Sequence, residues 1–248
     1  MGLDHFLDHL NGHARRLIFG NMINAIGMGL TMTLFLVYLH TIRGFSGGFS
    51  GLVMSYMAIF SMVINPLIGI LIDKYGGRLV LIFGLFIKAV GVFSLAFVES
   101  KPQVIGIATI LAIGDSANWP AQTVCLTRMV EEEARQKVFA FNFMALNLGI
   151  GIGGILSALI VTAGELITYQ RLYWMDSLTY LIYAAFAISL PVWVGQRLDK
   201  EDKQSGSYRE VFKNKELMKL KGFNVNNRKL LRNCVEPEVG EHILKSIL

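Results

Sequence analysis

Six long apolar stretches, separated by short polar gaps, restrict how this chain can fold more than any other feature. They cover about residues 17–39, 49–72, 79–98, 103–126, 139–163 and 172–194. An α-helix needs about 20 residues to cross about 30 Å of hydrocarbon at about 1.5 Å per residue. Hydrogen bonds inside a helix also satisfy the backbone groups, which lipid cannot do. The sequence therefore predicts an all-α membrane protein with six transmembrane helices.

Composition argues against a soluble protein and against an enzyme. Hydrophobic residues make up 53% of the chain, and its mean hydropathy is +0.50. The net charge of +5 does not indicate a nucleic-acid partner, because most bases lie in the short gaps or after residue 195. Cys125 and Cys234 have no spacing typical of zinc ligands or of a disulfide framework. No nucleophile–base pair or phosphate loop is present, so we expect neither an enzyme nor a cofactor.

The first residues contain a possible metal-binding pattern. His5, His9 and His13 repeat at helical spacing, with aspartates beside them, and these are metal-ligand residue types. Gly12 weakens a helix in this register. We interpret the segment as a solvated tail and predict no metal site.

The first apolar stretch follows Arg15 and Arg16, as in a secretory signal. It runs from Leu17 to Leu39, which is longer than the apolar core of a signal peptide. We therefore interpret it as a retained first helix.

Basic residues predict the orientation of the helices. Seven of them fall in the segments that face inside if the N-terminus is inside: Arg15, Arg16, Lys74, Arg78, Arg128, Arg135 and Lys137. Three fall in the outer gaps: Arg43, Lys101 and Arg171. Because cytoplasmic loops are enriched in lysine and arginine, both termini are predicted to lie in the cytoplasm, with the helices in the cell (inner) membrane.

This orientation gives three segments. Residues 1–16 form a cytoplasmic N-terminal tail, 17–194 a six-helix transmembrane domain, and 195–248 a basic cytoplasmic tail. Apolar residues of the last segment repeat at helical spacing among lysines and predict a short amphipathic helix at the inner leaflet: Tyr208, Val211, Phe212, Leu217 and Leu220.

Two charged residues stand out inside the apolar stretches. Lys88 and Asp115 both lie about 13–17 Å from the inner end of their predicted helices at 1.5 Å per residue. A charge inside a span costs about 2.5–3.5 kcal/mol on insertion scales, so it usually faces protein or a watery cavity. The two can form an intramembrane charge pair. Asp115 is then either an ion-coupling or cation-contacting group, or half of a purely structural pair.

Polar residues near Asp115 predict a cavity lining. Asn118 and Gln122 follow it on one helical face, and the first helix carries a similar strip: Asn21, Asn24, Met28, Thr31, Phe35 and Tyr38. Small residues would suffice for packing alone, whereas these strips contain amides and an acid. We predict that the solute is contacted by Asn24, Thr31, Asp115, Asn118 and Gln122.

Small residues dominate the fifth stretch. Its strip of Gly149, Gly151, Gly153, Gly154, Ser157 and Ala158 lets a neighbouring helix approach closely. We predict tight helix packing there.

The segment Gly69 to Leu81 carries a family resemblance. Its order of glycine, acid, base, glycine pair and base is similar to the motif between the second and third helices of the major facilitator superfamily. Asn65-Pro66-Leu67-Ile68-Gly69 ahead of the acid, Trp119-Pro120-Ala121 in the fourth stretch and Gly153-Gly154 in the fifth also resemble that family. The chain resembles the N-terminal six-helix half of a drug-efflux transporter.

The resemblance implies a mechanism. Such a transporter binds solute between two six-helix halves and rocks them to open on alternate sides. A gating role is implied for Gly69, Asp73, Lys74, Gly77 and Arg78, with Asp73 abutting a helix of the other half. One departure is that Ile110, with Gly114 after it, stands where drug antiporters carry an arginine linked to proton coupling. The proton-antiport mechanism is therefore not carried over.

The expected partners are the lipid bilayer and a small-molecule solute, together with a second six-helix half or a second copy in a homodimer. The alternative from another class is a truncated, non-transporting membrane fragment or assembly partner that needs a second half.

Overall fold

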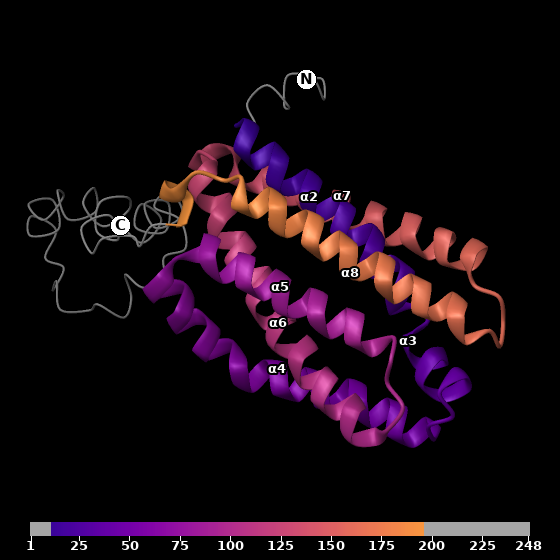
Figure 1. Cartoon of the computed structure of the whole chain (residues 1–248). Helices are drawn as coiled ribbons and strands as arrows, with labels where there is room; N and C mark the ends of the chain where they lie inside the picture. Colours follow the sequence, from indigo (N-terminus) through magenta and orange to yellow (C-terminus); the bar gives the residue numbers. More distant parts are fainter. Residues whose placement is uncertain (1–10, 196–248) are drawn as a thin grey trace, which may run out of the picture. The chain divides into compact units, whose positions relative to one another are not determined.

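The computed structural model describes residues 11–195, except for the side chain of Glu133, and in this range the chain is a bundle of helices (Figure 1). The long helices are α2 (Gly12–Met32), α4 (Gly47–Tyr75), α5 (Gly77–Leu95), α6 (Lys101–Met129), α7 (Glu132–Ile160) and α8 (Leu166–Ile188). The short ones are α3 (Phe35–Val37), the π-helix η1 (Tyr38–Ile42) and the 3₁₀-helix η2 (Val192–Gly195). Residues 11–195 contain no strand, and most of each predicted apolar stretch lies on one long helical segment.

The predicted amphipathic helix, from Tyr208 to Leu220, lies outside the described residues. So do Cys234, His5 and His9.

Four helical segments of the described range are long and apolar enough to cross a membrane. They are Gly12–Ile42, Gly47–Tyr75, Gly77–Leu95 and Ala134–Ile160. The remaining two long helices, α6 with 29 residues and α8 with 23, have sufficient length but carry more polar side chains, Asp115 and Asp176 among them. All-α architecture is therefore confirmed, whereas six membrane crossings stay a prediction.

Helix ends follow local capping more closely than the limits of the apolar stretches. The Asn11 side chain accepts a hydrogen bond from the His13 backbone N–H at 3.2 Å and so caps α2. Ser100 and Gln103 form a capping box at the start of α6. The charged residues 131–137, between the fourth and fifth apolar stretches, lie at the start of α7, which begins at Glu132. At the other end, α8 stops at Ile188 rather than near residue 194.

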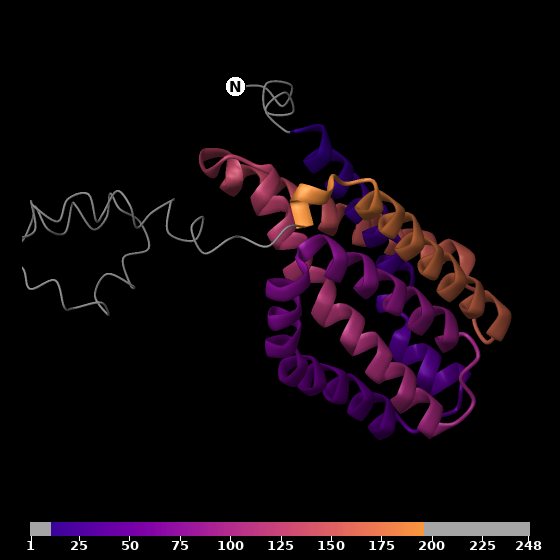
Figure 2. The same cartoon turned by 60° about the vertical axis from the view of Figure 1, so that its left-hand side comes forward.

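The helices pack in two groups joined by α8. In one group α2 packs against α7 and α8, and in the other α6 packs against α4 and α5 (Figures 1 and 2). Contacts between α5 and α8 hold the groups together. By contrast, α4 buries only four of its 29 residues, Ser50, Val53, Ile68 and Ile72. Most of its surface therefore remains open.

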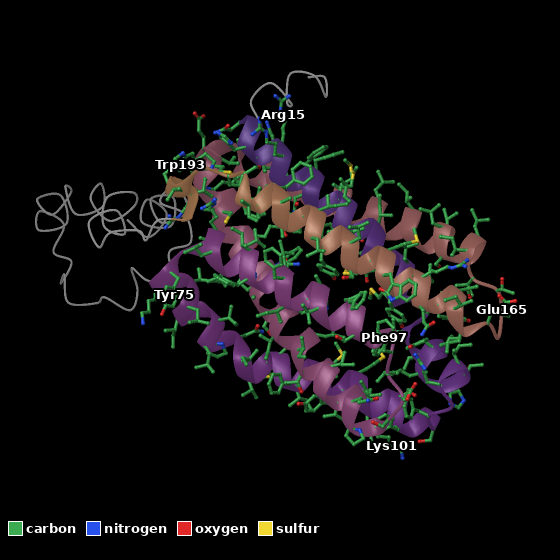
Figure 3. All side chains as sticks on the ribbon, viewed as in Figure 1. Arg15, Tyr75, Phe97, Lys101, Glu165 and Trp193 are labelled. Carbon is green, nitrogen blue, oxygen red and sulfur yellow. The ribbon has the colours of Figure 1, made fainter. Side chains whose placement is uncertain are left out.

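The ends of the helices gather at two opposite ends of the bundle, as antiparallel neighbours require. Arg15, Tyr75 and Trp193 lie at one end, and Phe97, Lys101 and Glu165 lie at the other (Figure 3). The predicted orientation would put the first three in the cytoplasm.

The crossing of α2 and α7 depends on glycine. A Cβ at Gly153 would lie 2.1 Å from the backbone oxygen of Ile26, and one at Gly29 would lie 2.3 Å from the oxygen of Ile150. These separations are far inside van der Waals contact, so the backbones touch without side chains between them. Because lipid is as apolar as a leucine side chain, such backbone contact is a main source of helix association in a membrane. The predicted tight packing is present at Gly149 and Gly153, whereas Gly151 and Gly154 face open space.

The turn between α4 and α5 requires glycine for two reasons. Gly76 ends α4 with φ of +86°, a left-handed value that side chains disfavour. A Cβ there would also lie 1.4 Å from the backbone oxygen of Gly195. The chain segment after α8 is thus packed directly on this turn.

Adjacent glycines of α7 provide a matched test of the crossing. We expect Gly153→Ala to destabilise the protein by about 1–3 kcal/mol, the usual cost of overpacking, because α2 must move away from the new methyl group. Gly154→Ala is the control: its Cβ meets nothing within 4 Å, and alanine favours a helix over glycine by about 1 kcal/mol. Thermal unfolding in detergent measures both. Equal stability of the two variants would contradict the glycine-dependent crossing.

Candidate functional site

Lys88 and Asp115 meet between α5 and α6. The Lys88 ammonium forms an ion pair with Asp115 Oδ2, and the side chains are 10% and 46% exposed, respectively. Glycine makes this approach possible, since a Cβ at Gly114 would lie 3.0 Å from that of Lys88. The acid of the pair is therefore accessible, and the base is covered by protein.

Asp176 of α8 is a third charged residue in this region, and the sequence reasoning missed it. The residue is 2% exposed. Its Oδ2 accepts a hydrogen bond of 2.7 Å from the Thr31 hydroxyl on α2, while its Oδ1 is buried and has no partner among the described residues. An acid inside the sixth apolar stretch was visible in the sequence in the same way as Asp115 in the fourth.

Three buried amides join α2, α6 and α7. Asn142 Oδ1 accepts from Asn21 Nδ2 at 3.1 Å and from Gln122 Nε2 at 3.0 Å. All three residues are at most 4% exposed. Interhelical hydrogen bonds of this kind are worth about 0.6 kcal/mol on average in a membrane, so the cluster fixes the relative positions of the three helices. Asn142, its centre, was not singled out in the sequence.

Asn24 and Asn118, the other two of the five residues predicted to contact the solute, differ in exposure. Asn24 is 3% exposed, with its amide beside the Tyr180 hydroxyl. Asn118 is half-buried, one helical turn beyond Asp115. The side-chain oxygens of both amides are buried and accept no hydrogen bond within residues 11–195.

The five predicted solute residues thus divide into two sets. Asp115 is exposed on α6, and Asn118 lies one turn further along at a half-buried position with its side-chain oxygen covered. The other three are buried against neighbouring helices: Thr31 donates to Asp176, Gln122 donates to Asn142, and Asn24 is covered as well. Tyr38, from the same predicted strip as Thr31, is fully buried and donates to the Leu95 backbone oxygen at 2.8 Å.

The predicted gating residues also divide. On α4, Gly69 and Asp73 are exposed one turn apart, and Lys74 lies over the ring of Tyr75. On α5, Gly77 packs against Val124 and Ala121 of α6.

Arg78 contacts the end of α8. Its guanidinium donates to the backbone oxygen of Ile188 at 2.7 Å. A cation is favourable at the C-terminal end of a helix, where the backbone oxygens carry partial negative charge. Within this domain, Arg78 therefore links α5 to α8.

A wholly apolar hollow of about 330 Å³ lies elsewhere, between α4, α5 and α6. Ile68, Tyr75, Phe83 and Ala117 are among the residues that line it, and none of the predicted solute residues does. Within residues 11–195, no group of three histidine, cysteine or acidic side chains is placed to hold a metal ion.

Comparison with known proteins finds similarity over nearly the whole helical bundle. The family model described as "Major Facilitator Superfamily" matches residues 17–233. The uncharacterized MFS-type transporter YttB of Bacillus subtilis is 26% identical over 167 residues, which are 67% of this chain and 41% of that protein.

Two further relatives are named for drug resistance. A multi-drug resistance efflux pump PmrA homolog of Lactococcus lactis is 26% identical over 153 residues, which are 59% of this chain and 38% of that protein. The quinolone resistance protein NorA of Staphylococcus aureus is 29% identical over 147 residues, which are 57% of this chain and 37% of that protein. The chain spans about two fifths of the length of these relatives. The match of the family model over most of the chain identifies it as a multi-pass membrane protein that belongs to the major facilitator superfamily.

Proposed function

We propose that this chain forms the N-terminal six-helix half of a transporter that moves a small amphipathic solute across the cell membrane by alternating access. In this proposal all six long helices cross the bilayer, with both termini in the cytoplasm. The direction is efflux, which is supported by the names of two relatives, a multi-drug resistance efflux pump homolog and a quinolone resistance protein.

The observation that carries the proposal is the accessible acid on α6. Asp115 is 46% exposed although it is paired with a covered lysine. Asn118 follows it one turn later, with a side-chain oxygen that has no partner in the described range. A half-open charge in the middle of a membrane helix is costly unless it faces a watery cavity or a ligand. This face of α6 is therefore our proposed solute-contacting surface.

The open helices supply a surface for the second half. The exposed apolar residues of α4 include Leu52, Met62 and Val63, and those of α7 include Ile155 and Leu159. We propose that the α4 and α7 surfaces pack against a second six-helix unit, which is either the remainder of a longer transporter, a separate chain or a second copy. The competing function is an assembly partner that docks in the same way and transports nothing.

Reconstitution separates the two functions. We expect purified protein in liposomes to accumulate or release a fluorescent amphipathic dye faster than empty liposomes do. Asp115→Asn should slow this movement at least tenfold, because it removes the accessible charge. An intact, folded protein that moves no dye, alone or with its second half supplied, would support the assembly partner and contradict the transporter.

Asn118 and Gln122 should respond differently to truncation. Asn118→Ala should weaken solute movement several-fold with little change in thermal stability, since its amide oxygen has no partner to lose. Gln122→Ala should lower thermal stability instead, because it removes a hydrogen bond at a buried cluster, a loss of about 0.5–1.5 kcal/mol. Dye movement and unfolding in detergent are measured on the same preparations. The assignment of Asn118 fails if its variant loses stability and keeps transport.

Asp73→Asn tests the gate. We expect slower transport, because the proposed contact of Asp73 is with the other half. Glu99→Gln is the control, an equivalent change at an exposed acid on the opposite end of the bundle. If Asp73→Asn and Glu99→Gln transport equally well, the gating role is wrong.

A further inference from the structure

The apolar hollow of about 330 Å³ between α4, α5 and α6 has small residues at its floor. Gly84 of α5 and Ala117 of α6 line it, and a Cβ at Gly84 would lie 2.7 Å from the Cβ of Ala117. The two helices therefore approach closely, and neither residue fills the space beside it. Apolar cavities stay free of water and take up apolar molecules instead, so in a membrane this hollow is a place for hydrocarbon.

The hollow runs along the helices from the turn between α4 and α5. On α5 its lining extends from Leu79, the third residue of the helix, to Ile87, which is about 12 Å at about 1.5 Å per residue. One leaflet contributes about 15 Å of hydrocarbon, half of the bilayer core. Leu71 and Phe83 also line the hollow and are exposed, so a chain can enter from the side. This length and this access fit one acyl chain of a lipid.

The hollow lies on a different side of α4 from the surface that we propose for a second six-helix unit. At about 100° per residue, Leu71 of the hollow is about 180° around the helix from Met62 of that surface. In the same way, Tyr75 of the hollow is about 160° around the helix from Asp73. A second unit packed on the other side of α4 therefore leaves the hollow open to lipid.

A lysine stands at the end of the hollow that is next to the turn. The Lys74 ammonium is 5.0 Å from the ring centre of Tyr75, which lines the hollow. Lys74 is exposed and forms no salt bridge within residues 11–195. Tyr75 lies at the same end of the bundle as Arg15 (Figure 3), and the proposed orientation puts this end in the cytoplasm. The cytoplasmic leaflet carries anionic lipids, which a base near its surface attracts.

We propose that the hollow is a binding site for a phospholipid with an anionic headgroup: one acyl chain fills the space between α4, α5 and α6, and Lys74 holds the phosphate. A long lysine side chain can follow an apolar surface and still keep its charge among the headgroups. A zwitterionic lipid brings a positive group close to the same lysine, so the site favours a lipid with a net negative charge. None of the residues proposed to contact the solute lines the hollow, so lipid binding is independent of solute movement.

Native mass spectrometry of the full chain in detergent tests the proposal, because it counts the lipids that the protein retains. We expect one dioleoylphosphatidylglycerol per chain to be retained at least tenfold more tightly than dioleoylphosphatidylcholine, which has the same chains and a zwitterionic headgroup. Glycerol 3-phosphate carries the negative charge without a chain, and at equal concentration it should not displace the lipid.

A larger side chain in the hollow tests the acyl-chain part of the site. Leu71→Trp should weaken retention of dioleoylphosphatidylglycerol at least tenfold, because the indole occupies space that the acyl chain needs. Ile70→Trp is the matched control, a tryptophan at the neighbouring exposed position of α4 that does not line the hollow. Its retention should stay within threefold of that of the unmodified protein.

Loss of one positive charge tests the headgroup part of the site. Lys74→Gln should reduce the preference for the anionic lipid to less than threefold and leave retention of dioleoylphosphatidylcholine unchanged. Lys101→Gln is the control: its ammonium also lies over an aromatic ring, 5.4 Å from the ring centre of Phe49, but at the opposite end of the bundle (Figure 3). The control should keep the full preference. A merely structural role of Lys74 would weaken the retention of both lipids equally.

All four substituted positions are exposed, so the variants are expected to fold. The inference is overturned if the unmodified protein retains both phospholipids equally, if Leu71→Trp retains the anionic lipid as well as Ile70→Trp does, or if Lys74→Gln keeps the full preference. Two other occupants of the hollow would also overturn it. A second copy of the chain would give dimers without bound lipid, and a detergent chain would give the same lipid retention in all four variants.

Discussion

Helices in hydrocarbon gain little from touching each other through apolar side chains, and this constraint explains how the bundle is held together. What remains is close backbone contact and hydrogen bonding between polar groups. Both converge on α2. Its backbone meets that of α7 at Gly29 and Gly153, and its Thr31 reaches Asp176 on α8. The first helix is therefore the common support of the α7 and α8 positions.

The same constraint sorts the polar residues into two kinds. Those that tie helices together have their partners inside the protein, as Asn21, Asn142 and Gln122 do. Asp115 differs because it is paired and yet half exposed. A structural ion pair would be better covered on both sides. The uneven exposure of Lys88 and Asp115, rather than the existence of the pair, is what favours a ligand-binding role.

The sequence predicted the helices well because each one depends on a property of neighbouring residues, namely the length of a continuous apolar stretch. It predicted the site only in part, since helical spacing gives the face of a helix but not the neighbour that covers it. Gln122 and Asn118 follow Asp115 on one predicted face, and only Gln122 meets Asn142. Asp176 could have been noticed as an acid within an apolar stretch, but its link to Thr31 depends on the packing of α2 on α8.

The segment from Gly69 to Arg78 divides into two parts with different surroundings. Gly76, Gly77 and Arg78 are engaged inside this domain, through the turn, through α6 and through the end of α8. Gly69 and Asp73 lie exposed, one turn apart, on α4. Arg78 is therefore expected to affect the stability of this domain by itself. At Gly69 no atom lies within 4 Å of where a Cβ would stand, so this side of α4 has room for another helix.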